Sequence, residues 1–282
     1  MNIKLENINY KYNEFEDKNV FNLKNISFDI EDNDYVAIIG ETGSGKSTLV
    51  QLLNGLIKAT SGAIYIDGKN IYDDKYDLNK LRQKVGLVFQ YPEYQFFAET
   101  VIEDVSFGAK NMGYSNEKAI QMAKTTLNMV GIKDELFDKL PFMLSGGEKR
   151  KVAIAGVLVM DPEVVIMDEP QAGLDPISKY ELFEMIDKLY KKGKTIIIVT
   201  HNMEDVIEYS KKVVIMRQGE LLAVDSPVNI FHNEKLLFDA HILKPEQVIL
   251  SQKLNKKYKN YNLDKIKTKD IIDEILRVVN NK

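Results

Sequence analysis

The chain has 282 residues, of which 44% are hydrophobic, so it can bury a large core and fold as a globular protein. Its 38 Lys and Arg residues are mixed with 42 Asp and Glu residues, which gives a net charge of -4 and no basic footprint for DNA or RNA. Nucleic-acid binding is therefore disfavoured. The absence of cysteine excludes disulfides and thiolate metal sites, and three scattered histidines argue against zinc.

No segment of the sequence is suited to crossing a membrane. The longest uninterrupted apolar stretch, residues 152–160, is about half as long as a membrane-crossing helix. Residues 1–6 lack the basic start and apolar core of a secretory signal. We therefore expect no direct membrane insertion and membrane attachment only through a partner, in a reducing cytosol.

The first predicted elements are antiparallel strands, because residues 2–30 alternate apolar and polar positions. From Tyr35 onwards the pattern changes to short apolar runs, which are typical of strands covered on both faces. These runs are residues 35–39, 85–89, 164–167, 196–199 and 213–216. Helical stretches separate several of them, so the sequence predicts an α/β fold with a mostly parallel sheet.

Helices dominate two later parts of the chain. Residues 78–140 read as helical, with a long amphipathic helix from Asn116 to about residue 130. After about residue 228 the sequence is rich in Lys and Asn, and we expect one helix begun by Pro245 and another capped by Thr268. The predicted organisation is a main domain over 1–230, with a helical subdomain at about 91–160, and a C-terminal helical extension over 231–282.

A glycine-rich loop follows the apolar run that ends at Ile39 and precedes a helical segment. In this context backbone N–H groups can wrap a polyphosphate, while Lys46 supplies a charge to its β and γ phosphates and Ser47 offers a hydroxyl to Mg²⁺. A chance glycine turn is the weaker alternative, and a dinucleotide-binding turn fits poorly because Thr48 replaces its third small residue. The predicted ATP-binding loop comprises Gly40, Glu41, Thr42, Gly43, Ser44, Gly45, Lys46, Ser47 and Thr48.

Two adjacent carboxylates, Asp168 and Glu169, follow the apolar run 164–167. Neighbouring side chains on an extended chain point in opposite directions, so the two acids should have different roles. Asp168 suits Mg²⁺ coordination through water, whereas Glu169 could polarise an attacking water as a general base. A solvated strand end is the alternative, and the phosphate loop weighs against it.

A second glycine element, residues 144–148, directly precedes a helix predicted over 149–160. Ser145 and the glycine amides would lie at the positive end of this helix, where they could bind a phosphate or serve only as a cap. Together with the earlier motifs, this element resembles the signature motif of the ABC ATPase family. By that resemblance the ATP site also includes Ser145, Gly146, Gly147 and Glu148.

The resemblance covers about residues 2–230 and implies a P-loop NTPase with a RecA-like parallel core sheet, an N-terminal antiparallel β subdomain and a helical signature subdomain. It also implies that Tyr12 stacks on adenine, that Gln90 contacts Mg²⁺ and the γ phosphate, and that His201 is the switch histidine. Taken alone, these could be an ordinary tyrosine, a surface amide and a structural histidine. The D-loop at the subunit interface corresponds to Ala172, Gly173, Leu174 and Asp175.

In this family two subunits pack head to tail, so each ATP lies between the phosphate loop of one and the signature motif of the other. The implied reaction is in-line attack of water, activated by Glu169, on the γ phosphate. Lys46, Mg²⁺, His201 and the signature serine of the partner would stabilise the developing charge. One chain alone should hydrolyse ATP poorly.

Longer strings are similar to the ATPases of energy-coupling factor transporters, which import vitamins or transition-metal ions in prokaryotes. These strings are residues 42–48, 52–56, 88–96 and 152–158. The similarity is greatest to the second ATPase of the heterodimeric form, with two departures. Gln171 stands where that family has Thr, and Glu148-Lys149-Arg150 replaces Gln-Met-Arg. Neither change removes a phosphate contact, and together they leave the paralogue open.

In that family the segment after Gln90 forms a groove for the coupling helices of a transmembrane scaffold protein. The residues that would line it, unless they are core residues, are Pro92, Tyr94, Phe96 and Phe97. The C-terminal helices would help two ATPases pair as a homo- or heterodimer, the alternative being a solvated Lys-rich tail. A separate substrate-binding membrane subunit would select the solute. These partners would place the chain on the cytoplasmic face of a prokaryotic cell membrane, as a peripheral protein.

Two other functions are compatible with the catalytic residues. A conventional ABC importer ATPase would share them all but would have a different membrane partner. A non-transport ABC protein acting on ribosomes or DNA is disfavoured, because such proteins usually carry two ATPase domains in one chain or a long coiled-coil insertion.

Overall fold

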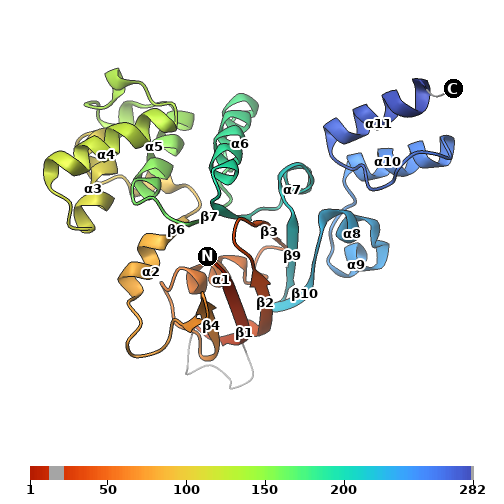
Figure 1. Cartoon of the computed structure of the whole chain (residues 1–282), viewed down its shortest axis with the longest axis horizontal. Helices are drawn as coiled ribbons and strands as arrows, with labels where there is room; N and C mark the ends of the chain where they lie inside the picture. The colour runs from red at the N-terminus through yellow and green to blue at the C-terminus, as the bar shows by residue number, and fades with distance from the viewer. Residues whose placement is uncertain (13–21, 281–282) are drawn as a thin grey trace.

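A computed structural model describes residues 1–12 and 22–280 of the chain. Two β-sheets occupy the centre, a group of helices lies on one side, and the C-terminal helices lie on the other (Figure 1). This arrangement confirms the predicted α/β fold with its parallel and antiparallel sheets. No helix in the two described ranges has the length and hydropathy needed to cross a bilayer.

The smaller sheet is antiparallel, with the strand order β2-β1-β4-β5. The predicted alternation is confirmed in its first strand, where Ile3, Leu5 and Ile8 are buried and the residues between them are more exposed. Helix α1 (Lys46–Leu53) shares one hydrophobic cluster with both sheets. The strands of the smaller sheet are β1 (Ile3–Tyr10), β2 (Leu23–Ile30), β4 (Ser61–Ile66) and β5 (Lys69–Asn70).

The larger sheet has the order β10-β9-β3-β8-β7-β6 and is parallel except for the antiparallel pair of β9 and β10. Its central strands are buried along their whole length, as fully apolar runs predict. The strands are β3 (Tyr35–Ile39), β6 (Val85–Val88), β7 (Val164–Asp168), β8 (Thr195–Val199), β9 (Lys212–Arg217) and β10 (Glu220–Asp225). The carboxyl ends of β3, β7 and β8 therefore meet at one edge, where ligands of such sheets bind.

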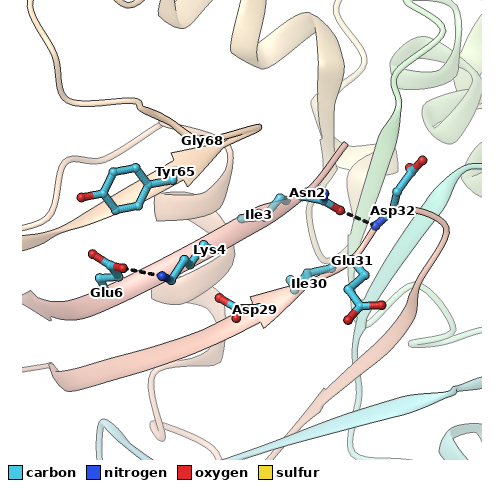
Figure 2. A pocket seen from close by; sticks show the side chains of 10 residues that line it. All are labelled: Asn2, Ile3, Lys4, Glu6, Asp29, Ile30, Glu31, Asp32, Tyr65 and Gly68. Atoms are coloured by element: carbon cyan, nitrogen blue, oxygen red, sulfur yellow. Dashed lines mark hydrogen bonds and ion pairs between the residues drawn. The ribbon is translucent and has the colours of Figure 1, made fainter.

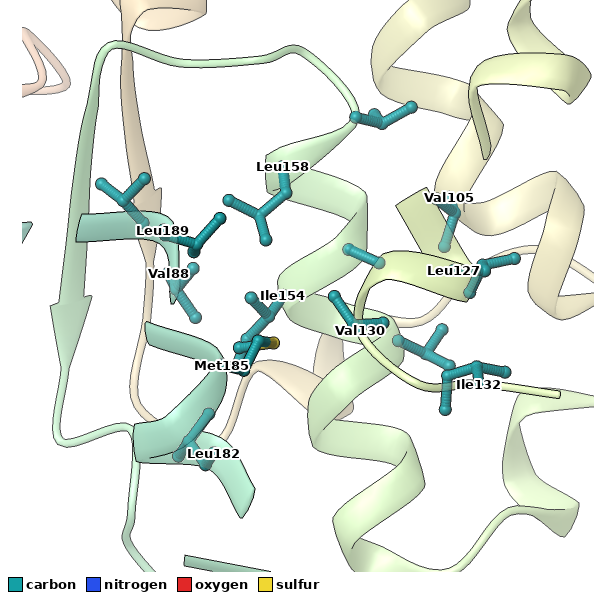
Figure 3. Packing of buried hydrophobic residues seen from close by; sticks show 14 of the residues in the cluster. Val88, Val105, Leu127, Val130, Ile132, Ile154, Leu158, Leu182, Met185 and Leu189 are labelled. Carbon is teal, nitrogen blue, oxygen red and sulfur yellow. The ribbon is translucent and has the colours of Figure 1, made fainter. Parts of the chain in front are cut away.

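Three helices form the helical region beside β6. Helices α3 (Val101–Asn111), α4 (Asn116–Met129) and α5 (Gly146–Leu158) meet through Val105, Leu127 and Ile154 (Figure 3). The same cluster continues through Val88 of β6 to Leu182 of α6 (Pro176–Lys191). This packing holds the N-terminus of α5 against the main sheet. The remaining elements of this half are α2 (Leu78–Lys84) and the short 3₁₀ helices η1 (Pro92–Gln95), η2 (Asp134–Leu136) and η3 (Pro141–Met143).

The prediction for α5 was wrong at its start, because the helix begins at Gly146 rather than at residue 149. Two glycines disfavour a helix, but Ser145 and Glu148 form a reciprocal capping box that stabilises this first turn. By contrast, the predicted start of α4 at Asn116 is confirmed, with Ser115 as its N-cap.

The C-terminal segment packs against the main sheet. Phe231, Leu237 and Ile266 are buried in the same cluster as Ile39 and Ile215, so this segment is not a wholly solvated tail. The helices of this half of the chain are α7 (Met203–Tyr209), α8 (Pro227–His232), α9 (Glu234–Asp239), α10 (Glu246–Lys257) and α11 (Thr268–Asn280). Thr268 is thus the first residue of its helix rather than a preceding cap. The division of the chain after residue 230 stays a prediction, and α8 crosses it.

Candidate active site

The phosphate loop connects the end of β3 to the start of α1. Gly40 and Gly45 have φ values of 147° and 100°, in the region that favours glycine. A Cβ on Gly40 would lie 2.0 Å from the carbonyl oxygen of Met216, and one on Gly45 would lie 2.5 Å from Leu23 Cδ2. The loop can therefore lie this close to the protein only with glycine at both positions.

Lys46 is the first residue of α1, and its side chain folds back over this loop. Its Nζ donates hydrogen bonds to the carbonyl oxygens of Gly40 and Glu41, each at 2.8 Å. Burial lowers the pKa of Lys46, while the negative charges of Glu169 and Asp168 raise it and offset part of that effect. The lysine therefore lies within electrostatic reach of both predicted acids.

Asp168 ends β7 and is buried, with 7% of its surface exposed. Burial raises the pKa of its carboxyl group, whereas a hydrogen bond from the Ser47 side chain and the charge of Lys46 lower it. The structure thus brings together the hydroxyl and the carboxylate that the sequence predicts as Mg²⁺ ligands. Gln90, the third predicted ligand, is exposed after β6, and its side chain makes no hydrogen bond to the described residues.

The side chain of Glu169 has different hydrogen-bond partners from that of its neighbour Asp168. His201 Nδ1 lies 2.9 Å from Glu169 Oε1, and Gln171 Nε2 donates to Glu169 Oε2 at 2.9 Å. Because a carboxylate only accepts, the proton of the first bond belongs to Nδ1. Glu169 also has a φ of 48°, which is uncommon for glutamate, and its backbone N–H donates to the carbonyl of Val199.

Lys46, Glu169 and His201 line one cleft of about 490 Å³. The loop residues Gly40, Glu41 and Thr42 form one wall. Residues 240–243 after α9 form another wall, where His241 Nδ1 lies 2.7 Å from Glu41 Oε1. Sequence reasoning did not find this contribution of the C-terminal segment, because only the fold brings it to the loop.

Tyr12 lies on the other side of the loop. It lines a hollow of about 420 Å³ together with Gly43, Gly45, Lys46, Ser47 and Thr48. Its hydroxyl shares a hydrogen bond of 2.9 Å with Thr48 Oγ1, and its ring packs edge-on against Tyr10. More than half of Tyr12 is exposed, so an aromatic surface is accessible beside the phosphate loop.

The signature residues lie apart from both of these hollows. Ser145 Oγ donates to Glu148 Oε2 at 2.7 Å, and this bond lowers the pKa of Glu148. Neither residue, nor Gly146 or Gly147, lines the cleft or the hollow beside the loop. The signature motif is therefore not brought to the phosphate loop of its own chain.

The D-loop residues are held by a residue that sequence reasoning missed. Arg150, which is 1% exposed, donates to the carbonyl oxygens of Pro170 at 2.7 Å and Ala172 at 2.9 Å. Its guanidinium also pairs with Glu93 of η1. The turn ends at Asp175, which caps α6, and Gly173 and Leu174 lie between. Arg150 thus connects the signature helix to the turns after β6 and β7.

The predicted groove residues divide into two groups. Pro92, Phe96 and Phe97 line a groove of about 260 Å³ between the segment after β6 and helices α3 and α5. Pro92 is buried, whereas Phe97 is exposed and packs edge-on against Phe107. Tyr94 is 83% exposed and does not line the groove.

A larger hollow, of about 730 Å³, lies on the antiparallel sheet and shares no residue with the sites above (Figure 2). Two pairs of its polar groups interact: Lys4 with Glu6 at 2.6 Å, and the Asn2 side chain with the backbone N–H of Asp32 at 2.9 Å. None of the predicted site residues lines this hollow, so the candidate active site is the cleft at the phosphate loop.

This fold and this loop define an ABC ATPase, and residues 23–172 match the ABC transporter family. The chain belongs to that family. Within it the chain is 44% identical to the energy-coupling factor transporter ATP-binding protein EcfA2 of Caldanaerobacter subterraneus subsp. tengcongensis, over 98% of this chain and 97% of the relative. It is 43% identical to EcfA2 of Clostridium perfringens, over 100% and 99% of the two chains. The chain therefore belongs, within the ABC family, with the energy-coupling factor transporter ATP-binding proteins.

Solved structures agree with this assignment. The structure of cbiO1 from Clostridium perfringens, described as part of the ABC transporter complex cbiONQ, has a TM-score of 0.74 at 38% identity and covers 91% of this chain and 95% of its own. The ADP- and phosphate-bound dimer of the ATP-binding cassette MJ0796 has a TM-score of 0.71 at 30% identity and covers 80% and 98%.

Proposed function

We propose that this chain hydrolyses ATP as one half of an ATPase pair on the cytoplasmic face of the membrane, and so powers solute uptake by an energy-coupling factor transporter. The observation that carries the proposal is that Lys46, Glu169 and His201 line one cleft at the edge where the parallel strands end. The relatives named EcfA2 support the transporter class. The solute, a vitamin or a transition-metal ion, would be selected by a separate membrane subunit.

The phosphate loop would bind the β and γ phosphates of ATP. Its amides open helix α1, whose N-terminus favours negative charge. Lys46 is the only lysine or arginine among the described residues that line the cleft. It would therefore supply most of the side-chain charge that offsets the phosphates. Tyr12 would stack on the adenine ring beside the loop.

Mg²⁺ fits the donor set beside Lys46. The Ser47 hydroxyl and the Asp168 carboxylate, which hydrogen bond to each other, are oxygen ligands of the kind that this ion prefers. Gln90 would add a third oxygen. When bound, Mg²⁺ supplies positive charge against the phosphate oxygens. In the described part of the chain, no group of three or more acidic, histidine or cysteine residues forms a metal site, which agrees with an ion held largely by phosphates and water.

Glu169 would accept the proton of the water that attacks the γ phosphate. Its carboxylate is held on one oxygen by His201 and on the other by Gln171, so its orientation is fixed before reaction. Lys46 and His201 would stabilise the charge that develops on the γ phosphate.

A second ATPase would complete the site, because the signature motif of this chain does not reach its own phosphate loop. Ser145, Gly146, Gly147 and Glu148 would face the ATP of the partner, with the D-loop at the same interface. The C-terminal helix α11 exposes Ile272, Leu276 and Val279 at helical spacing, which supports a contribution to pairing. The groove at Pro92, Phe96 and Phe97 would receive a coupling helix of the transmembrane scaffold protein.

The test is Glu169→Gln in the complete membrane complex, compared with Glu163→Gln at an exposed acid that pairs with Lys84. Glu169→Gln should bind ATP normally but stall as a closed pair, with turnover reduced by at least about 100-fold. The control should behave like the wild type. Near-normal turnover of Glu169→Gln would contradict the role of this acid. Co-purification of a small substrate-binding membrane protein with the complex would favour an energy-coupling factor transporter over a conventional ABC importer.

A further inference from the structure

The turn after β7 places Gln171 against the carboxylate of Glu169. Gln171 Nε2 donates to Glu169 Oε2 at 2.9 Å and to Thr200 Oγ1 at 2.7 Å. Because a carboxylate only accepts, the nitrogen of the amide must face Glu169, so chemistry fixes the orientation of this amide. Gln171 is 9% exposed, which leaves its side chain little freedom to move.

The same contacts join the acid to the strand that leads to His201. Thr200 follows β8 and precedes His201, and its hydroxyl also accepts a hydrogen bond from the backbone N–H of Asn202 at 3.0 Å. His201 contacts the other carboxylate oxygen of Glu169. Each oxygen of Glu169 therefore has one side-chain donor, and Gln171 links one of them to the end of β8.

These contacts come with two destabilising features. The amide oxygen of Gln171 is buried and has no hydrogen-bond partner among the described residues, and an unpaired buried acceptor destabilises a fold. Glu169 has a φ of 48°, which strains a residue with a side chain. Stability alone therefore does not explain the glutamine.

We infer that Gln171 is a positioning residue for ATP hydrolysis, whose amide fixes the rotation of the Glu169 carboxylate so that it faces the cleft. A threonine at this position would carry its hydroxyl directly on Cβ. That hydroxyl is too close to the backbone to occupy the position of Nε2, from which Gln171 makes both bonds. The inference rests on the proposed role of Glu169 as the group that activates water.

The test is Gln171→Met, which keeps the length of the side chain but removes the donor. In the complete complex it should lower kcat for ATP hydrolysis by about 10-fold and leave the KM for ATP within about twofold, because the phosphate contacts are unchanged. Its unfolding midpoint should stay close to that of the wild type, because removal of the unpaired amide oxygen offsets the lost hydrogen bond to Glu169. Gln171→Thr, whose hydroxyl cannot reach Glu169 Oε2, should also lose kcat severalfold.

Three results separate the possible failures. Wild-type kcat in both Gln171 variants would overturn the inference. A loss of kcat accompanied by a higher KM and a lower unfolding midpoint would also overturn it, because the residue would then be merely structural. Glu169→Gln is measured in parallel to separate the proposed function from the positioning role of Gln171. If Glu169→Gln retains wild-type turnover, the proposed function itself fails. If Glu169→Gln loses turnover while the Gln171 variants stay normal, only the positioning role is refuted.

Discussion

Replacing Arg150 with methionine should destabilise the fold strongly, because its guanidinium joins three parts of the chain that are distant in sequence. It donates to the carbonyl oxygens of Pro170 and Ala172 and pairs with the carboxylate of Glu93, with Nε and Oε2 2.9 Å apart. Methionine fills much of the same volume but satisfies none of these acceptors. Glu93, whose side chain is only 16% exposed, would be left as an unpaired acid beside the main core.

The expected magnitude follows from this burial. Removing one partner of a buried ion pair costs about 3–5 kcal/mol, because the other charge stays desolvated. For a protein of this size, about 1 kcal/mol corresponds to roughly 2–4 °C in the unfolding midpoint. We therefore expect Arg150→Met to lower the midpoint by about 6–20 °C.

Thermal unfolding followed by circular dichroism measures this difference. Lys149→Met is the matched control, because Lys149 precedes Arg150 on the same helix but is partly exposed, and it should stay within about 0.5 kcal/mol of the wild type. Adding Glu93→Gln to Arg150→Met should recover part of the loss by removing the orphaned charge. A midpoint for Arg150→Met within about 2 °C of the wild type would refute the reasoning.

Three further predictions concern other parts of the chain. Lys46→Ala should weaken ATP binding or turnover by at least about 10-fold, because it removes the side-chain cation of the loop, and unchanged values in a nucleotide titration and turnover assay would contradict the phosphate site. Ser145→Ala should cost about 1 kcal/mol by removing the capping box of α5, and an unchanged unfolding midpoint would show that the cap contributes nothing. The hydrogen bond from Arg277, with a smaller contribution from the backbone N–H of Asn262, lowers the pKa of Glu274 from 4.5 to about 2, so the stabilisation by this carboxylate is present above pH 4.5 and is lost as the pH falls towards 2. Arg277→Met should lose this contribution above pH 4.5 and flatten this part of the stability profile in urea unfolding at a series of pH values, and an unaltered profile would refute the pairing.

The central strands could be predicted closely from the sequence because their burial leaves a plain signal. Each run of consecutive apolar residues became a strand with ends within one residue of the prediction, since both faces of the parallel sheet are covered. The phosphate loop could also be predicted from the sequence, because glycine is required where the chain approaches Met216 and Leu23. The roles of the individual site residues stay predictions.

Other features depend on contacts between distant parts of the chain. The role of Arg150 could not be predicted, because nothing in the local sequence shows that Glu93 and two carbonyls will surround it. The amide of Gln171 meets Thr200 only after β7 and β8 pair. The packing of Ile266 against the main sheet could not be predicted either, because the Lys-rich composition around it resembles a solvated tail.

The most direct test of the account is a structure of the assembled ATPase pair bound to a non-hydrolysable ATP analogue. We expect the γ phosphate within hydrogen-bonding distance of Lys46 Nζ, with the carboxylate of Glu169 facing it and the signature motif of the partner on its other side. A terminal phosphate bound away from Lys46, or a Glu169 side chain directed away from the nucleotide in the closed pair, would contradict the account.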